Sequence, residues 1–443
     1  MKVFLARIEE ANSKLNTIVS QLPASEALAR AAAADKEIAA GVISPIHGLP
    51  IAIKDLNAVK GFRTTFGSRA HIDDPVSKTD LAFVERIRRA GAIIIGKTNT
   101  PERGVGTLAF NEVFGVTRNP WDLSKHGGGS SGAGAAVAAG LLPFADGSDS
   151  GGSIRYPSSF CNTVGLRTTP GLVPFEATGD RWSPHLVFGP MARSSEDAAL
   201  LLSVMAGASV ESPIAIDGAP DSFLTLDEVD LSQLRIAWSA DAGGLPVSKE
   251  IRDAYARARE TLEGLGCTID DVEPDFSNAD RAWEAVEMFC FFMDAPESIN
   301  THPDLFRPDY VRNVKQGAAT VAADLAFGLK ERTALYLETA RLLERYDVFV
   351  TPATPVSAPP AEVEWVREID GHVFDRYLFW QRLACRLTMT GHPVLVTPGG
   401  FTDTGMPFGL QITGPMRGDH RLLSIGNAIE LATGWAARRP TAV

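Results

Sequence analysis

Cysteine is scarce in this chain of 443 residues, and the few cysteines do not cluster. Four are present, far apart and without any Cys-x-x-Cys pair: Cys161, Cys267, Cys290 and Cys385. A disulfide framework and a zinc knuckle both need closely spaced cysteines, so the sequence predicts neither. We expect reduced thiols in the core and no metal site.

Positive charge is also in short supply. The chain has 42 lysines and arginines against 54 aspartates and glutamates, a net charge of -12. A protein that binds the phosphates of nucleic acid needs a positive surface, so a nucleic-acid partner is not predicted. With 45% hydrophobic and 22% charged residues, the composition is typical of a globular protein. We expect the partner to be a small molecule.

Long apolar runs are absent. Arg7 and two glutamates interrupt the N-terminal segment before it reaches the length of a signal peptide. The longest apolar stretch, at about 135–145, contains Gly140 and Pro143 and is too short to cross a bilayer. The sequence therefore predicts no membrane span and a cytoplasmic location.

The first part of the chain alternates between patterns typical of strands and helices. A short apolar run, IAIKD (51–55), reads as a buried strand whose polar end carries Lys54. A helical segment from Thr79 to Ala90 and a second buried run, AIIIGKTNT (92–100), follow it. This alternation predicts an α/β fold.

The later part of the chain continues the pattern, with one interruption. Residues from about 276 to 345 read as mostly helical, and we expect a helical cap or insertion there. Further strands are predicted in four runs: LRIAWS (234–239), YDVFVTPATP (346–355), GHPVLVTPGG (391–400) and PFGLQIT (407–413).

Residues 126–157, HGGGSSGAGAAVAAGLLPFADGSDSGGSIRYP, place a glycine and serine loop on each side of a helix-forming run. Single loops of this kind usually make only tight turns. The GxxxxGK[ST] and GxGxxG fingerprints of nucleotide-binding loops are both missing. Residues 128–132 fit GxSxG, but a nucleophile elbow needs a preceding strand and a late histidine, for which only His392 and His420 are candidates.

A serine can also act as a nucleophile without a histidine if a lysine serves as the base. An ordinary lysine has a pKa of about 10.4, and burial can lower this value by about 3 to 5 units. Lys54, at the end of its strand, is the candidate base. It would take the proton of a nucleophilic serine through a second, intermediate serine. The small residues from Ser150 to Ser153 would let consecutive backbone amides hold an oxyanion.

Four motifs together resemble the amidase signature family of serine hydrolases: IAIKD (51–55), GKTNTPE (96–102), NPWDLSKHGGGSSGAGAA (119–136) and GSDSGGSIRYPSSFCNTVGLR (147–167). The resemblance implies one α/β domain over residues 1–443, with a large mixed β-sheet covered by helices on both faces. It also implies hydrolysis of a carbon-nitrogen amide bond through an acyl-enzyme. Neither a cofactor nor a metal is implied.

The resemblance also assigns roles to single residues. Ser153 would be the nucleophile, Lys54 the base and Ser130 the bridging residue of a Ser-Ser-Lys triad. An ion pair between Asp149 and Arg155 would support the nucleophile loop. The oxyanion hole would be formed by the backbone amides of Ser150, Gly151, Gly152 and Ser153.

One spacing departs from the family. Ser130 precedes Ser153 by 23 positions, one fewer than the family pattern has, so counting back from Ser153 places Gly129 at the bridging position. A shortening within the GSSGAG turn would restore Ser130 to its role, whereas an earlier shortening would leave no bridging hydroxyl. We expect Ser130 to be the bridging residue, and the alternative stays open.

Two other functions fit the same motifs. One is the glutamine-hydrolysing component of an aminoacyl-tRNA amidotransferase, and the other is a catalytically impaired member that binds an amide. Esters and carbamates would react by the same route, and a homodimer is compatible with the sequence. Aromatic residues near predicted loops indicate a substrate with an apolar or aromatic acyl or amine group: Phe110, Trp182, Phe188, Trp365 and Phe379.

Overall fold

The protein is described by a computed structural model that covers residues 1–42, 44–176 and 179–443. Within these residues, eight strands form one large sheet. In sheet order the strands are β4 (Phe144–Asp149), β6 (Val187–Ala192), β5 (Val164–Arg167), β12 (Val394–Phe401), β13 (Pro407–Thr413), β9 (Val348–Pro352), β7 (Arg235–Trp238) and β8 (Thr268–Asp271). The pairs from β4 to β9 are antiparallel, and β9, β7 and β8 are mutually parallel. The predicted large mixed sheet is confirmed.

Helices cover both faces of this sheet, and β12 shows how. Thr397 points to one face, where its hydroxyl donates to Glu430 in α13 (Asp419–Thr433). On the other face, Gly409 of the neighbouring strand β13 packs closely against Ser159 in α5 (Arg155–Cys161). Because both faces are covered, β12 and β13 are almost entirely buried, which explains their apolar runs.

The strand that carries Lys54 belongs to a second, smaller sheet. Its three strands, in sheet order, are β1 (Ile18–Gln21), β3 (Ile93–Thr98) and β2 (Pro50–Lys54). β2 and β3 are parallel and joined through α3 (Ala82–Arg89), as the strand, helix and strand pattern predicts. The sequence does not reveal that β1 joins them, or that this sheet is separate from the large one.

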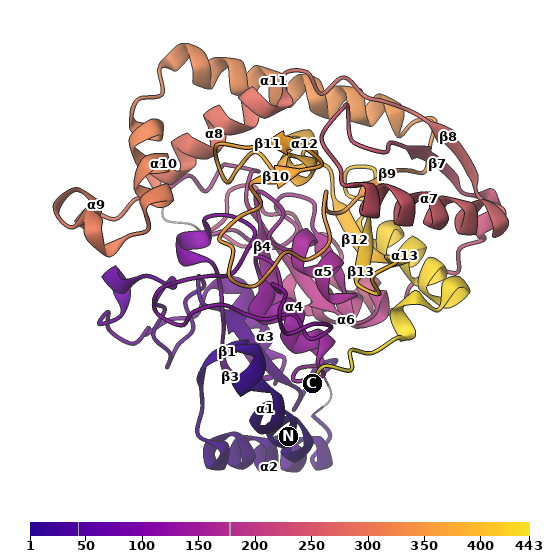
Figure 1. Ribbon diagram of the computed structural model, residues 1–443. Coiled ribbons are helices and arrows are strands. Elements are labelled where there is room, and N and C mark those ends of the chain that lie inside the picture. Colours follow the sequence, from indigo (N-terminus) through magenta and orange to yellow (C-terminus); the bar gives the residue numbers. More distant parts are fainter. Residues whose placement is uncertain (43, 177–178) are drawn as a thin grey trace.

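The segment predicted as a helical cap contains α8 (Ala279–Met293), α9 (Ser298–Thr301), α10 (Pro308–Ala318) and α11 (Ala322–Leu342). In Figure 1, α8, α10 and α11 lie together at the top of the molecule, while α1, α2 and the small sheet lie at the bottom. Helix α8 packs against α12 (Arg382–Thr390), in which the carbonyl of Ala384 accepts a hydrogen bond from Arg155 of α5. A single domain with this cap stays a prediction.

The remaining helices lie in several parts of the fold (Figure 1). They are α1 (Lys2–Leu15), α2 (Ala24–Ala39), α4 (Ser131–Ala138), α6 (Ser195–Met205) and α7 (Lys249–Gly264), and a short hairpin pairs β10 (Glu368–Ile369) with β11 (His372–Val373). The chain ends meet near α1, where Arg7 donates a hydrogen bond to the carbonyl of Val443.

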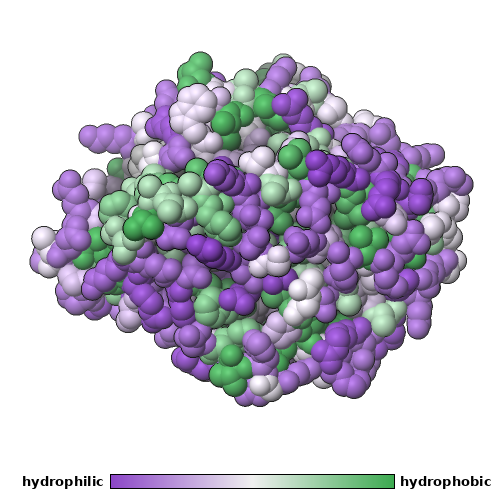
Figure 2. All heavy atoms as spheres, turned by 90° about the horizontal axis from the view of Figure 1, so that it is seen from above, coloured by the Kyte–Doolittle hydropathy of each residue, from purple (hydrophilic) through white to green (hydrophobic). Residues whose placement is uncertain are grey.

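The outer surface is mixed in character. Figure 2 shows hydrophilic side chains interspersed with small apolar groups over the upper face. In the part of the chain that the structure describes, no helix is both long and apolar enough to cross a membrane.

Candidate active site

Lys54 is the last residue of β2 and lies between the two sheets. Its side chain is 1% exposed. The backbone N-H of Lys54 donates to Asp146 Oδ1 in β4 at 2.9 Å. Its amine Nζ donates to the hydroxyl of Ser148 at 3.0 Å and reaches the carbonyl of Ser148 at 3.5 Å. Strand β4 of the large sheet therefore fixes both ends of this lysine.

Burial prepares this amine to act as a base. Desolvation lowers the pKa of Lys54 from 10.5 to about 8, although the carboxylates of Asp146 and Asp149 act in the opposite direction. A lysine in water is almost fully protonated at neutral pH, whereas a pKa near 8 leaves a useful neutral fraction. The two carboxylates keep the shift smaller than desolvation alone would make it.

The loop that carries Ser153 runs from the end of β4 to the start of α5. Asp149 folds it by accepting hydrogen bonds from the backbone amides of Gly152, at 3.0 Å, and Ile154, at 3.1 Å. Gly152 has a φ of +109°, and a side chain there would meet Ala384 at 2.7 Å, so glycine is required. Ser153 on this loop is largely buried, with 8% of its surface exposed.

The predicted supporting residues form a fully buried ion pair. Arg155 Nη2 lies 2.7 Å from Asp149 Oδ1, and Arg155 Nε donates to Asp149 Oδ2 at 3.0 Å. Arg155 also donates to the carbonyl of Ala384 and to the side chains of Gln411 and Thr388. Burial by itself would raise the pKa of Asp149, but Arg155 and then Arg167 hold that pKa well below its usual range. The carboxylate is therefore ionised and serves as a scaffold.

Replacing Arg155 by methionine is expected to destabilise the protein by about 3 to 5 kcal/mol, because the ionised Asp149 would remain buried without its partner. Urea unfolding followed by circular dichroism measures this loss. Lys249→Met is the control, since it removes an exposed pair with Asp253 and should leave the unfolding midpoint almost unchanged. A midpoint for Arg155→Met as high as that of the control would contradict the scaffold role.

A second layer of residues contacts the predicted oxyanion loop. The hydroxyl of Ser150 donates to Glu287 Oε1 in α8 at 2.9 Å, and Glu287 Oε2 lies 2.8 Å from His185 Nε2. Beside Gly151, a side-chain carbon would meet Gln381 Nε2 at 2.9 Å and Trp283 at 3.4 Å. These residues come from distant helices and loops and no local motif marks them, so they could not be predicted from the sequence.

Gly129 and Ser130 lie directly against the nucleophile. A side-chain carbon added to Gly129 would lie 3.0 Å from Ser153 Oγ. The backbone N-H of Ser130 donates to the carbonyl of Ser153 at 2.9 Å. The hydroxyl of Ser130 is buried and has no hydrogen-bond partner among the described residues. The structure thus brings Lys54, Ser153 and both bridging candidates into one region, while the Ser130 hydroxyl bonds to neither Lys54 nor Ser153.

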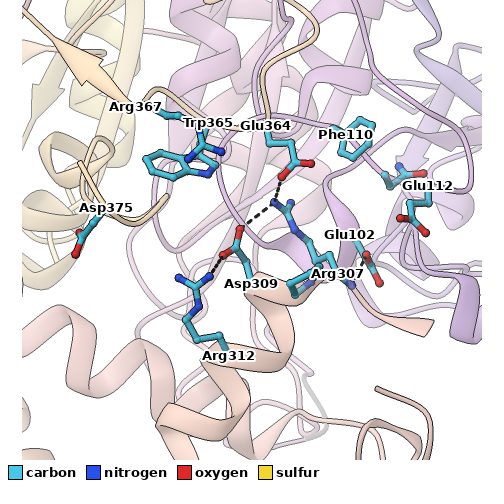
Figure 3. A pocket seen from close by; sticks show the side chains of 12 residues that line it. Glu102, Phe110, Glu112, Arg307, Asp309, Arg312, Glu364, Trp365, Arg367 and Asp375 are labelled. Carbon is cyan, nitrogen blue, oxygen red and sulfur yellow. Dashed lines mark hydrogen bonds and ion pairs between the residues drawn. The ribbon is translucent and has the colours of Figure 1, made fainter. Parts of the chain in front are cut away.

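A charged pocket of about 310 Å³ lies beside this region (Figure 3). Arg307 in its wall lies 3.4 Å from Asp309 and 3.8 Å from Glu364. Its described lining residues include Glu102, Phe110 and Trp365, but not Lys54, Ser130 or Ser153. Thr107 lies between Glu102 and Phe110 in the same segment. Its Cα would lie 3.2 Å from a side-chain carbon added to Gly129. The pocket therefore adjoins the site and is not its reacting centre.

The other candidate groups have structural contacts instead. His392 Nδ1 lies 2.9 Å from the carbonyl of Thr390, and His420 Nε2 lies 2.9 Å from that of Thr225, so neither is placed as the base of a serine. Phe188 is the second residue of β6 and is buried in the core, so it is not exposed to a substrate. All four cysteines are free thiols.

The family model and the related sequences that match this chain are of amidases or amidotransferase components. The model of the family described as Amidase matches residues 1–423. An acylamidase from Rhodococcus erythropolis is 32% identical over 445 residues, which cover 99% of this chain and 92% of that protein. A component of the glutamyl-tRNA(Gln) amidotransferase from Coxiella burnetii is 32% identical over 472 residues, covering 99% of this chain and 94% of that component.

A solved structure agrees with these sequence matches. The crystal structure of a bacterial aryl acylamidase of the amidase signature family superposes with a TM-score of 0.86 and 25% identity, covering 99% of this chain and 95% of that one. The chain therefore belongs to the amidase signature family, and it is an amide-hydrolysing enzyme.

Proposed function

We propose that this enzyme cleaves carbon-nitrogen amide bonds through an acyl-enzyme on Ser153, with neutral Lys54 as the base. The observation that carries the proposal is the burial of Lys54, which lowers the pKa of its amine to about 8. Lys54 lies against β4, the strand that leads into the loop carrying Ser153. Surface lysines have no such neutral fraction at pH 7. A structural lysine at this position would need an ion pair, but the Lys54 amine bonds to the neutral Ser148.

The reaction begins when the Ser153 hydroxyl loses its proton towards Lys54 and its oxygen attacks the amide carbon. The backbone amides of the loop from Ser150 to Ser153 hold the oxyanion that forms. The carbon-nitrogen bond then breaks, and the leaving nitrogen takes the proton from the Lys54 ammonium. Water attacks the resulting ester, Lys54 accepts its proton, and the acid leaves as Ser153 regains a hydrogen.

We propose aryl amides as the preferred substrates. Both the Rhodococcus relative and the solved structure are described as acylamidases, the latter as an aryl acylamidase. Phe110 and Trp365, two of the aromatic residues singled out in the sequence, line the pocket of Figure 3. Esters and carbamates of similar shape would acylate the same serine. The four free thiols support a reducing, cytoplasmic location, and we propose a small-molecule amide as the only partner needed.

The second candidate function, release of ammonia from glutamine within an amidotransferase, rests on the similarity to the Coxiella protein. The chain aligns with the acylamidase over 445 positions and with the amidotransferase component over 472, so the second alignment contains more gaps. A free hydrolase is therefore the better proposal.

A substrate panel tests both candidates. The panel contains an aryl amide that releases a coloured aniline, short aliphatic amides, an aryl carbamate and L-glutamine. We expect steady release of aniline from the aryl amide, and a burst of leaving group from the aryl carbamate that equals the enzyme concentration, because a carbamoyl-enzyme is hydrolysed slowly. Release of ammonia from glutamine, without turnover of any aryl substrate, would favour the amidotransferase function.

The rate constant for aniline release, which reports acylation, should depend on pH as the neutral form of Lys54 does. Below about pH 8 the lysine is protonated and cannot accept a proton, so the rate should rise about tenfold per pH unit and level off above pH 8. Stopped-flow measurements of aniline release from pH 6 to pH 10 provide the profile. A rate that is already level at pH 6, or that still rises at pH 10, would contradict Lys54 as the base.

A further inference from the structure

We propose that His126 is a positioning residue for the proposed reaction. Its imidazole accepts a hydrogen bond from the backbone of Gly128, and this bond holds the turn of residues 127–130 against Ser153. His126 is the first residue of the glycine and serine motif at 126–157, and the steps of the reaction give it no part. The inference rests on the proposed function, since the turn supports the nucleophile of that reaction.

The turn of residues 127–130 lies directly against the nucleophile. The backbone N-H of Ser130 donates to the carbonyl of Ser153 at 2.9 Å. A side-chain carbon added to Gly129 would lie 3.0 Å from Ser153 Oγ and 3.2 Å from Ser153 Cα. Because the turn and Ser153 are in contact, a shift of the turn would displace the nucleophile or change what surrounds it.

Glycine makes this turn possible and also leaves it free to move. Gly128 has a φ of +101°, and a side-chain carbon there would lie 2.6 Å from the Cα of Pro157 in α5, so only glycine fits. Three glycines in a row, at 127–129, have more backbone freedom than any other residues would have. Hydrogen bonds from outside the turn must therefore hold it in one conformation.

His126 provides one of these hydrogen bonds. Its Nδ1 accepts from the backbone N-H of Gly128 at 3.1 Å. The carbonyl of Gly128 accepts from the backbone of Ala109 at 2.6 Å, and the N-H of Gly127 donates to the carbonyl of Thr117 at 3.1 Å. Among the described residues, His126 is the only side chain that bonds to Gly128. Its bond is therefore the one hydrogen bond of Gly128 that a substitution can remove.

The imidazole can accept through Nδ1 only while that nitrogen carries no proton. Burial of the ring, and next the nearby Arg118, lower the pKa of His126 from 6.5 to about 3. The ring is therefore neutral at neutral pH, with its hydrogen on Nε2. The one basic nitrogen of the ring is bonded to Gly128, so this histidine does not serve as the base for a serine.

The other ring nitrogen indicates that packing alone does not account for this residue. Nε2 of His126 is buried and has no hydrogen-bond partner among the residues that the structure describes. A buried polar group without a partner costs free energy, which an apolar side chain of similar size would avoid. The bond from Gly128 is the one contact of the ring that such an apolar side chain could not make.

Two substitutions separate the hydrogen bond from the packing. The side-chain oxygen in His126→Asn can accept from the N-H two residues further on, as in an Asx turn, but asparagine fills less space than histidine. Leucine in His126→Leu fills a similar space and has no acceptor. Both kcat and KM for an aryl amide are measured at pH 7, and thermal unfolding shows whether each variant is folded at the assay temperature.

We expect kcat of His126→Leu to fall about tenfold or more below wild type, because small misplacements of reacting groups cost rates of this order. His126→Asn should keep about a third or more of the wild-type kcat, since its oxygen takes the place of Nδ1. A residue needed only for packing would give the opposite order, because asparagine leaves the larger cavity.

Nuclear magnetic resonance of the wild-type protein, with ¹⁵N in its histidines, tests the same contact without a substitution. The signals of His126 are those missing from a His126 variant. We expect the hydrogen on Nε2, a bare Nδ1 and no change between pH 5 and pH 9. A hydrogen on Nδ1, or titration near the ordinary histidine pKa of about 6.5, would overturn the inference.

Two kinetic results would also overturn it. One is a kcat for His126→Leu within about threefold of wild type. The other is a kcat for His126→Asn that is no higher than that of His126→Leu. Failure of the proposed function looks different, because the wild-type protein would then release no aniline from the amide.

Discussion

Ser153→Ala is expected to abolish acylation and to reduce amide hydrolysis by about 10⁴-fold or more. Every step of the proposed reaction forms or breaks a bond to this oxygen, and removing a nucleophilic serine from a serine hydrolase costs rates of this order or larger. The Ser153 side chain is 8% exposed on a loop held by Asp149, so the substitution should not unfold the protein. Aniline release from an aryl amide measures the loss.

Ser150→Ala is the matched control for this prediction. Ser150 lies three positions earlier on the same loop, but its hydroxyl bonds to Glu287 and not to the nucleophile. We expect a rate within about tenfold of wild type, because the backbone amide that would contact the oxyanion is retained. If Ser150→Ala were inactive and Ser153→Ala active, the nucleophile would have been assigned to the wrong serine.

Lys54→Met is expected to slow acylation by about 10² to 10⁴-fold at pH 7, the usual contribution of a positioned base. The loss should become smaller above pH 10, because hydroxide can take the proton when the amine is absent. Methionine retains much of the apolar volume of the lysine, so packing between β2 and β4 should be preserved. Rates of aniline release by wild type and variant from pH 7 to pH 11 test this prediction.

Lys97→Met is the control, because Lys97 is the second buried lysine of the same small sheet. Its amine lies 3.2 Å from Asp55 and donates to the carbonyl of Asn57, so its contacts are structural. We expect this variant to be less stable but to keep the pH dependence of wild type. An equal loss of rate at all pH values in Lys54→Met would mean that Lys54, like Lys97, is structural.

Much of the fold could be predicted because buried strands leave a clear pattern. The strands at 50–54, 93–98, 348–352, 394–401 and 407–413 have apolar runs that are enclosed on both sides, and all were predicted. Strand β4 was missed because its sequence, FADGSD, is half polar. Those polar residues face the site, where Asp146 accepts from Lys54 and Asp149 binds Arg155. Strands β1, β5, β6 and β8 were not predicted either, although β5 and β6 are buried along their whole length.

The parts of the site that lie within the sequence motifs could be predicted. Lys54 and the loop from Asp149 to Arg155 follow from local sequence, and the structure places them together. Glu287 and His185 could not be found in this way, because their contact with Ser150 depends on how α8 packs over the loop. Counting positions also left Gly129 and Ser130 as alternatives, since spacing does not show which side chain points at Ser153.

Labelling with a fluorophosphonate, followed by peptide mapping, shows directly whether Ser153 is an activated nucleophile. The reagent forms a stable bond to an activated serine and needs no knowledge of the natural substrate. We expect one label per chain, on Ser153, with a rate that rises towards about pH 8 as Lys54 loses its proton. A chain that remains unlabelled, or that carries its label on another serine, would contradict the assignment of Ser153 as the nucleophile.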